Sequence, residues 1–170
     1  MWAPTRQGTW PHATMGSPAS PPNGSPRPRD GGAADPRVLG VLLAGGRSSR
    51  FGAGNKLLAD LRGEAVVRHA ARTLLDADVD EVIVVLGHEA AAVRAALTDL
   101  DVRFAENPRY EGGLATSVAR GVEAAAAGAD AALFPPGDVP DVAPASVDLL
   151  VGAHRGDLAT AVAACYEGRR

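Results

Sequence analysis

The fold of this chain is decided by residues 38–58, Val-Leu-Gly-Val-Leu-Leu-Ala-Gly-Gly-Arg-Ser-Ser-Arg-Phe-Gly-Ala-Gly-Asn-Lys-Leu-Leu. The opening residues, 38–44, are almost all apolar and rich in Val and Leu, which predicts a buried strand of a parallel sheet. Glycines at positions 45 and 46 allow a sharp turn and let backbone N–H groups come close to a ligand. Because serines, arginines and a lysine follow, the loop after this strand is suited to binding phosphate.

Length and composition limit the classes of function. A chain of 170 residues forms one domain with a sizeable core, and its net charge of −3 gives no basic surface for nucleic acid. No apolar run reaches the roughly 18 residues of a membrane-spanning helix, and the first residues lack the apolar centre of a secretory signal. Cys165 is the sole cysteine, which argues against a disulfide framework or a cysteine-based metal cluster and predicts a cytoplasmic location. We expect neither nucleic acid nor a membrane as a partner.

Residues 1–36 differ from the rest of the chain. They are rich in Pro, Gly, Ser and Ala and show neither strand nor helix periodicity. Such a composition buries too little apolar surface to offset the entropy of ordering, so we predict a disordered tail over 1–36 and a folded domain over 37–170. A docking role for the tail, a dispensable extension and a later start at Met15 all remain open.

From residue 37 onward, predicted strands and helices alternate. The strands are expected at 38–44, 81–86, 102–105, 131–134 and 158–165, and the helices at 65–77, 90–100, 114–125 and 144–151. This alternation is typical of the α/β class, as a three-layer α/β/α sandwich around a mostly parallel, Rossmann-like sheet. Ligands of such sheets bind at the carboxyl ends of the strands. We therefore expect three polar loops, 45–56, 106–117 and 137–141, to meet around one cleft.

Two familiar phosphate-binding loops do not fit the first of these loops. The P-loop requires Gly-Lys-Ser/Thr, whereas Lys56 lies between Asn55 and Leu57. The dinucleotide fingerprint requires G-x-G-x-x-G directly after the strand, and the Gly-Gly-Arg-Ser-Ser-Arg at 45–50 does not match it. A nicotinamide-dependent dehydrogenase is thus disfavoured.

A third loop pattern fits. Residues 43–52, Leu-Ala-Gly-Gly-Arg-Ser-Ser-Arg-Phe-Gly, with Asn-Lys-Leu-Leu at 55–58, resemble the signature of nucleotidyltransferases that have the nucleotide-diphospho-sugar transferase fold. Three further stretches resemble that signature in the same order: Val-Val-Leu-Gly-His at 84–88, Glu-Asn-Pro-Arg-Tyr-Glu-Gly-Gly at 106–113 and Gly-Asp-Val-Pro at 137–140. Within this superfamily the chain is most similar to the molybdenum-cofactor nucleotidyltransferases, over roughly residues 38–166.

The resemblance implies transfer of an NMP group from an NTP to a phosphate acceptor, with release of pyrophosphate. Such a reaction needs N–H donors, cationic side chains and Mg²⁺ to hold two polyanions together. Arg50 can bind two phosphate oxygens, Lys56 can follow the α-phosphate into the transition state, and Asp138 is a hard oxygen ligand for Mg²⁺. These three form the predicted catalytic set, with Asp138 as the metal ligand. The predicted nucleotide contacts are Leu43, Ala44, Gly45, Gly46, Arg47, Ser48, Lys56, Asn107, Gly113 and Ser117.

Some of these residues also have a plain structural explanation. Arg47 can be a solvated loop charge, and Asp138 and Asn107 can be turn residues, since both types favour turns. Ser117 can simply pack within its helix. Lys56 is a clearer candidate for a functional residue, because it is the sole lysine among 17 Lys and Arg residues. The alternative is a surface lysine that survived by chance.

Two departures from the family pattern leave alternatives open. The doubled glycine at 45–46 is closer to the guanylyltransferase branch, whereas Asn-Lys-Leu-Leu at 55–58 and the Asn-Pro loop at 107–108 are closer to the cytidylyltransferase branch. We favour CTP, with GTP as the alternative. Family members also continue past the position of Arg170 with a further strand and helices. We therefore expect a C-terminally short domain that is less stable than a full-length relative.

The resemblance further implies the partners. They are an NTP, a small phosphorylated acceptor identified with molybdopterin, and a molybdoenzyme or its chaperone as the recipient. Two other interpretations remain open: a catalytically defective remnant that binds a nucleotide without turnover, and a nucleotidyltransferase for a sugar phosphate or another small phosphorylated acceptor.

Overall fold

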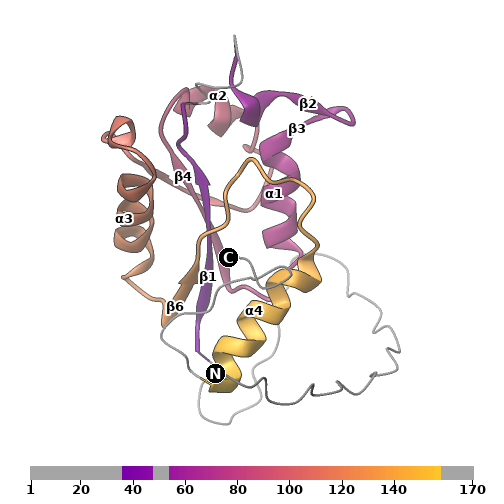
Figure 1. The fold of residues 1–170 in the computed structure, drawn as a ribbon, viewed down its shortest axis with the longest axis vertical. Helices are drawn as coiled ribbons and strands as arrows, with labels where there is room; N and C mark the ends of the chain where they lie inside the picture. The colour runs from indigo at the N-terminus through magenta and orange to yellow at the C-terminus, as the bar shows by residue number, and fades with distance from the viewer. Residues whose placement is uncertain (1–35, 48–53, 158–170) are drawn as a thin grey trace, which may run out of the picture.

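The computed structural model describes residues 36–47 and 54–157, which form an α/β fold around a four-stranded parallel sheet (Figure 1). The strands are β1 (Val38–Ala44), β4 (Glu81–Leu86), β5 (Arg103–Glu106) and β6 (Ala131–Leu133), in the spatial order β5-β4-β1-β6. The chain therefore builds outward from β1 to β5 and then returns to the other side of β1. This order places the topological switch point between β1 and β6.

β1 is the central strand of the sheet. Its residues pair in parallel with all of β4 on one side and with β6 on the other. Leu39, Val41 and Leu42 are each at most 1% exposed. The strand is thus covered on both faces, which explains why its sequence is a continuous apolar run rather than an alternating one.

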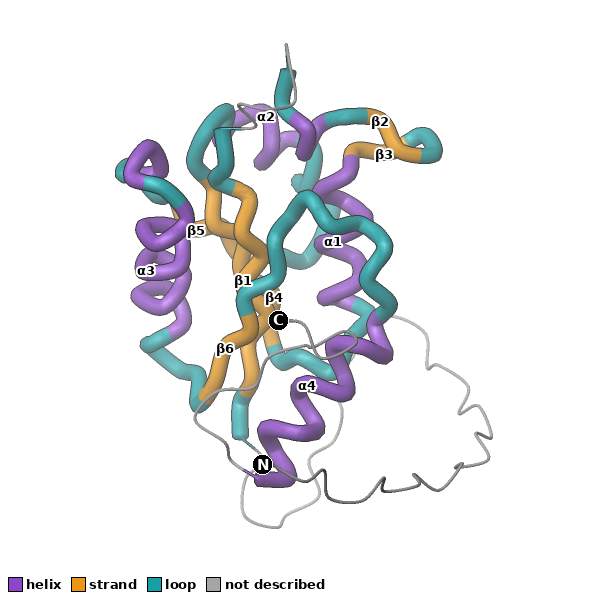
Figure 2. The backbone as a smooth tube through the Cα atoms, in the orientation of Figure 1, coloured by secondary structure: helices purple, strands orange, loops and turns teal. Residues whose placement is uncertain are grey.

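Helices cover both faces of the sheet (Figure 2). On one face, α1 (Val66–Leu75), α2 (Ala90–Ala95) and α4 (Pro144–Asp157) share a core cluster with β1 and β4. On the opposite face, α3 (Leu114–Ala125) packs against the other side of the same strands. The predicted α/β fold with helices on both faces of a parallel sheet is therefore confirmed.

α3 packs on the sheet through its small residues. Gly121 and Ala125 are buried, whereas Leu114 and Val122 are 68% and 51% exposed. A Cβ atom at Gly121 would lie 2.6 Å from Cγ1 of Val41, so the helix backbone sits directly on the strand. The predicted helix is confirmed, but the larger apolar residues that mark it in the sequence lie largely on its solvent side.

Three helices differ in length from the sequence prediction. α1 covers residues 66–75 rather than 65–77. α4 continues to Asp157, beyond the predicted end at 151, and α2 ends at Ala95, although apolar residues keep a helical spacing up to position 100. The predicted strand at 158–165 and residues 1–35 of the predicted 1–36 tail lie outside the residues that the structure describes.

One element is missing from the sequence prediction. A short antiparallel hairpin, β2 (Asp60–Leu61) and β3 (Glu64–Ala65), joins the 3-10 turn η1 (Lys56–Leu58) to α1. A second 3-10 turn, η2 (Tyr110–Gly112), precedes α3.

Within residues 36–47 and 54–157, no helix combines the length and the apolar character needed to cross a membrane.

Candidate functional site

Lys56 is positioned by η1 just after the loop that follows β1. Asn55 caps this turn, because its Oδ1 accepts a hydrogen bond of 3.1 Å from the backbone N–H of Leu57. Leu57 is 3% exposed and anchors the turn in the core that β1 shares with α1. The backbone of Lys56 is thus held between a capped residue and a buried one.

Asp138 is positioned by an extension of the pairing between β1 and β6. The N–H of Leu43 donates to the carbonyl of Pro135 at 2.9 Å, and the N–H of Gly137 donates to the carbonyl of Leu43, also at 2.9 Å. Residues 135–137 therefore run beside the end of β1. Asp138 is the next residue along, directly beyond the carboxyl edge of the sheet.

Lys56 and Asp138 meet at this edge. The ammonium of Lys56 donates to Oδ2 of Asp138, and the two side chains are 38% and 31% exposed. An ion pair this accessible to water contributes little to stability. Its position matters more, because ligands of open parallel sheets bind outside the strand ends at the switch point, which here lies between β1 and β6.

The Gly45 turn lies on the other side of β1, against the end of β4. The N–H of His88 donates to the carbonyl of Gly45 at 3.3 Å. A Cβ atom at Gly87 would lie 2.7 Å from that carbonyl oxygen and 2.6 Å from Cβ of Tyr110. The two loops therefore touch through bare backbone, and a side chain at position 87 would separate them.

The side-chain amide of Asn107 forms hydrogen bonds within the protein. Asn107 is 3% exposed, its Oδ1 accepts from the N–H of Arg109, and its Nδ2 donates to Thr116 and Ser117 at 3.0 and 3.2 Å. A Cβ atom at Gly45 would lie 3.1 Å from Oγ of Ser117. These bonds tie the loop after β5 to the first turn of α3 and bring Ser117 beside the Gly45 turn. Direct contact of Asn107 or Ser117 with a nucleotide stays a prediction.

The remaining predicted contacts lie around this turn. Gly46 is exposed, and a Cβ atom there would meet no atom within 4 Å. Arg47 is solvent-accessible, and its Nη1 lies 3.9 Å from Oε1 of Glu111 on η2. Gly113 is the N-cap residue before α3 and has a φ of 91°. The predictions for Ser48 and Arg50 lie outside the described residues.

The three loops lie at one edge of the sheet in two pairs, and their enclosing one cleft stays a prediction. Residues 45–47 contact the 106–117 loop, and Lys56 contacts the 137–141 loop. A shallow depression of about 250 Å³ opens beside the second pair, lined by Lys56, Ala59, Leu61, Val66, Asp138, Pro140 and Asp141. The 106–117 loop does not line it. Sequence reasoning missed three of these residues, Ala59, Leu61 and Val66, because they belong to no motif.

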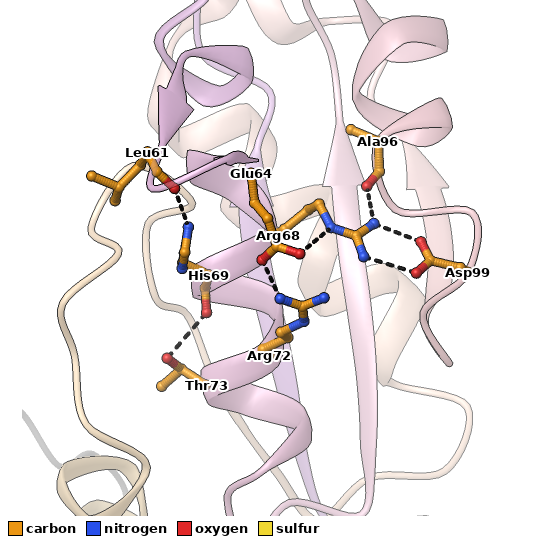
Figure 3. Close-up of polar contacts among 8 residues, drawn as sticks. All are labelled: Leu61, Glu64, Arg68, His69, Arg72, Thr73, Ala96 and Asp99. Atoms are coloured by element: carbon orange, nitrogen blue, oxygen red, sulfur yellow. Dashed lines mark hydrogen bonds and ion pairs between the residues drawn. The ribbon is translucent and has the colours of Figure 1, made fainter.

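A polar network on α1 supports the hairpin (Figure 3). Nε2 of His69 donates to the carbonyl of Leu61 at 2.8 Å, and the carboxylate of Glu64 accepts from the guanidinium of Arg72. Arg68 reaches across to Asp99 with two hydrogen bonds, the longer of which is 2.8 Å. The hairpin and the segment after α2 are thus both tied to one helix.

These contacts shift the pKa values of their carboxylates. The hydrogen bond from Arg72 holds the pKa of Glu64 below its usual value. The hydrogen bond from Arg68 lowers the pKa of Asp99 to about 2, and the same contact raises the pKa of Arg68. All three groups therefore stay charged at neutral pH.

Asp138 is the carboxylate at the strand edge that could hold a metal ion. The described residues contain no group of three or more His, Cys, Asp or Glu side chains arranged to hold a metal ion. Mg²⁺ does not require such a group, because it is usually bound by one or two carboxylates, several waters and the phosphates of its substrate. The accessible carboxylate of Asp138 at the strand edge fits that mode, and a pre-built protein cage for a structural metal does not fit.

Known proteins resemble this chain in sequence and in fold. Residues 40–170 match the MobA-like NTP transferase domain family. The curated relatives include nicotine blue oxidoreductase of Paenarthrobacter nicotinovorans, 37% identical over 71% of this chain and 58% of the relative, and a probable molybdenum cofactor guanylyltransferase of Haloferax mediterranei, 34% identical over 69% of this chain and 55% of the relative. The solved structure of a nucleotidyl transferase from Methanothermobacter thermautotrophicus superposes with a TM-score of 0.63 at 37% identity, covering 68% of this chain and 57% of that chain.

The matches differ in how much of each protein they cover. The chain spans a little over half the length of the curated relatives that it matches. The match to the family, by contrast, begins within β1 and runs through every described element to the last residue. This chain belongs to the MobA-like NTP transferase domain family.

Proposed function

We propose that this chain binds an NTP at the carboxyl edge of its sheet and takes part in transferring the NMP group to a phosphorylated acceptor, identified with molybdopterin. The observation that carries the proposal is the pairing of Lys56 with Asp138 at the switch point, on the same edge of the sheet as the Gly45–Gly46 turn. Similarity to the Haloferax guanylyltransferase relative and to the Methanothermobacter nucleotidyl transferase supports nucleotidyl transfer.

In the proposed reaction, an oxygen of the acceptor phosphate forms a bond to the α-phosphorus of the NTP. The bond from that phosphorus to the bridging oxygen breaks, and pyrophosphate leaves with the electron pair. Lys56 neutralises charge that builds on the α-phosphate, and the N–H groups of Gly45 and Gly46 orient the phosphates. Asp138 would hold Mg²⁺, which when bound would offset the charge of the leaving pyrophosphate.

The observations on which nucleobase the NTP carries point in opposite directions. The motifs at 55–58 and 107–108 favour cytidine, whereas the doubled glycine at 45–46 and the guanylyltransferase relative favour guanosine. We propose GTP as the first nucleotide to test and CTP as the second.

The test is release of pyrophosphate by the purified chain with Mg²⁺, molybdopterin and each of the four labelled NTPs. The proposal predicts release with one nucleotide and none when molybdopterin is omitted. Binding of an NTP without release would favour the alternative of a nucleotide-binding remnant. Absence of binding for all four nucleotides would overturn the proposal.

Oxidoreductase chemistry is a second candidate, because one curated relative at 37% identity is named nicotine blue oxidoreductase. The dinucleotide fingerprint is missing after β1, which weakens this candidate. Incubation with nicotine blue and NADH or NADPH, followed by absorbance of the nicotinamide, tests it directly. Consumption of the reduced nucleotide above the blank would replace the transferase proposal.

A further inference from the structure

The guanidinium of Arg68 on α1 holds two other elements at once (Figure 3). Its Nη1 donates to the carbonyl of Ala96, the C-cap residue of α2, at 2.6 Å. Nη1 and Nη2 also donate to the two carboxylate oxygens of Asp99, at 2.5 and 2.8 Å. On the side of the hairpin, Nε of Arg68 lies 3.8 Å from Oε1 of Glu64 in β3. One planar group therefore joins the hairpin to the end of α2.

These contacts fix a geometry more than they add stability. Arg68 is 16% exposed, but the side chain of Asp99 is 67% exposed, and ion pairs that reach water contribute only modestly to the free energy of unfolding. The two hydrogen bonds to Asp99, by contrast, hold the planar guanidinium in one orientation. The carboxylate of Glu64 is also held by Arg72, one turn further along α1 than Arg68. The hairpin and the end of α2 are thus both fixed relative to α1.

The turn that carries Lys56 lies between the hairpin and α2. Along the chain, the N–H of Ala59 donates to the carbonyl of Lys56 at 3.3 Å, and the N–H of Val66 donates to the carbonyl of Ala59 at 3.0 Å. In space, η1 also neighbours α2, and Leu57 lies in the same core cluster as Val93. A shift of the hairpin or of α2 relative to α1 would therefore move Lys56.

α2 also connects this region to the Gly45 turn. Its N-cap residue, Glu89, directly follows His88, whose N–H donates to the carbonyl of Gly45 at 3.3 Å. The helix is only six residues long, so its two ends are about 9 Å apart. Its start is thus next to the Gly45 turn, and its end is bonded to Arg68. Arg68 therefore influences where Lys56 lies relative to the Gly45 turn.

We propose that Arg68 is a positioning residue for nucleotidyl transfer: by joining the hairpin and α2 to one helix, it holds Lys56 at the distance from the Gly45 turn at which a single NTP contacts both. A misplacement on the order of 1 Å can lower a rate by about 10²-fold. Arg68 acts through Lys56 and does not itself touch the substrate. This inference rests on the proposed function, and it adds a residue that belongs to none of the sequence motifs.

The experiment compares Arg68→Met with Arg155→Met. Methionine keeps an unbranched side chain, removes the fork of N–H donors and adds no second lysine. Arg155 on α4 is a matched control, because it is 20% exposed and its guanidinium lies 2.5 Å from Asp78 and 3.7 Å from Asp80. These carboxylates precede β4, at the amino ends of the strands, whereas Lys56 lies at the carboxyl edge.

Three quantities are measured for each protein. They are the affinity for GTP or CTP with Mg²⁺, the kcat of pyrophosphate release, and the degree to which saturating nucleotide protects Lys56 from an amine-selective acylating reagent. Urea denaturation measures stability in parallel, and both variants should unfold at lower urea concentrations than the wild type. The protection of Lys56 requires binding alone, so it reports the position of this side chain separately from turnover.

We expect Arg68→Met to lower kcat by about 10- to 100-fold and to reduce the protection of Lys56, because the bound nucleotide no longer meets the displaced ammonium. Its nucleotide affinity should stay within about threefold of the wild type, since the Gly45 side of the site is retained. Arg155→Met should keep wild-type kcat and protection. Asp99→Asn, which removes one anchor from an exposed position, should lower kcat by about three- to tenfold and replaces Arg68→Met in the test if that variant does not fold.

Wild-type kcat and protection in Arg68→Met would overturn the inference. An equal loss in Arg155→Met would also overturn it, because lower stability alone would then explain the effect. A parallel loss of nucleotide affinity and kcat in Arg68→Met would show a collapsed site rather than a misplaced Lys56. If the wild type binds an NTP without turnover, the protection of Lys56 decides. A wild-type protein that binds no NTP would instead overturn the proposed function.

Discussion

Lys56 and Asp138, which lie 82 positions apart in the sequence, form an ion pair at the carboxyl edge of the sheet. The contact depends on the return of the chain to the free side of β1, since Asp138 follows β6 and Lys56 follows β1. Each group offsets the charge of the other. Binding of a nucleotide with Mg²⁺ would exchange this one contact for two, from the ammonium to phosphate and from the carboxylate to metal.

Replacing Lys56 by alanine should lower nucleotidyl transfer by about 10²- to 10³-fold, because a preorganised cation facing the transition-state charge is lost. The pair is partly exposed, so the free energy of unfolding should fall by less than about 1 kcal/mol. Initial rates of pyrophosphate release and urea denaturation check the two expectations. Arg62→Ala, which removes a more exposed cation nearby, is the control and should retain the wild-type rate. Unchanged turnover in Lys56→Ala would remove this residue from the reaction.

Replacing Asp138 by asparagine should raise the Mg²⁺ concentration needed for half-maximal activity, because a neutral amide oxygen is a weaker ligand for a hard cation than a carboxylate. A titration of activity against Mg²⁺ at saturating nucleotide measures the shift. Asp141→Asn removes the same charge from another carboxylate that lines the depression and should leave the titration midpoint in place. A wild-type midpoint in Asp138→Asn would refute the metal-binding role.

The contact between the Gly45 turn and the end of β4 can be tested with a pair of glycine variants. Gly87→Ala should lower the free energy of unfolding by about 1–3 kcal/mol, since its Cβ would overlap Tyr110 and the carbonyl of Gly45. Gly46→Ala adds the same methyl group where no atom lies within 4 Å, and it should unfold at nearly the wild-type urea concentration. Equal stability of the two variants would show that the two loops do not touch as described.

The ion pair between Arg68 and Asp99 predicts a defined loss of stability in acid. The pKa of Asp99 is lowered to about 2 in the folded protein, so the carboxylate stabilises the fold above its ordinary pKa of 3.8. That contribution is fully present at neutral pH and disappears as the pH falls from about 5 to about 2. Urea denaturation of Asp99→Asn should therefore show lower stability than the wild type at neutral pH and a shrinking difference across this interval. Asp101→Asn is the control, and a wild-type-like Asp99→Asn at neutral pH would contradict the assignment.

The two central strands of the sheet, β1 and β4, were predictable because each is a compact apolar run between turn residues. β1 and β4 appear in the structure at the predicted residues, and Lys56 and Asp138 were found because each belongs to its own motif. The contact between Lys56 and Asp138 could not be predicted from these motifs, because it depends on the order of the strands in the sheet. The buried face of α3 could not be predicted either, because it is set by the close packing of Gly121 against Val41 on the neighbouring strand.

The hairpin β2–β3 could not be predicted from the sequence. Its strands are two residues long, too short to show an alternating pattern. Its turn has positive φ at two successive residues, 58° at Arg62 and 89° at Gly63. Sequences usually signal such turns by Asn-Gly or Asp-Gly, and Arg62 gives no such signal. The depression beside Lys56 could therefore not be predicted in full, because Leu61 of this hairpin and its neighbours Ala59 and Val66 line it.

The central claim is that a nucleotide with Mg²⁺ binds against Lys56. Because Lys56 is the sole lysine, an amine-selective acylating reagent modifies it without competition from another lysine, and peptide mass spectrometry can follow its rate of modification. The account predicts that GTP or CTP with Mg²⁺ slows this modification in proportion to occupancy, while modification of the N-terminal amine is unaffected. The same rate of acylation of Lys56 with and without saturating nucleotide would contradict the account.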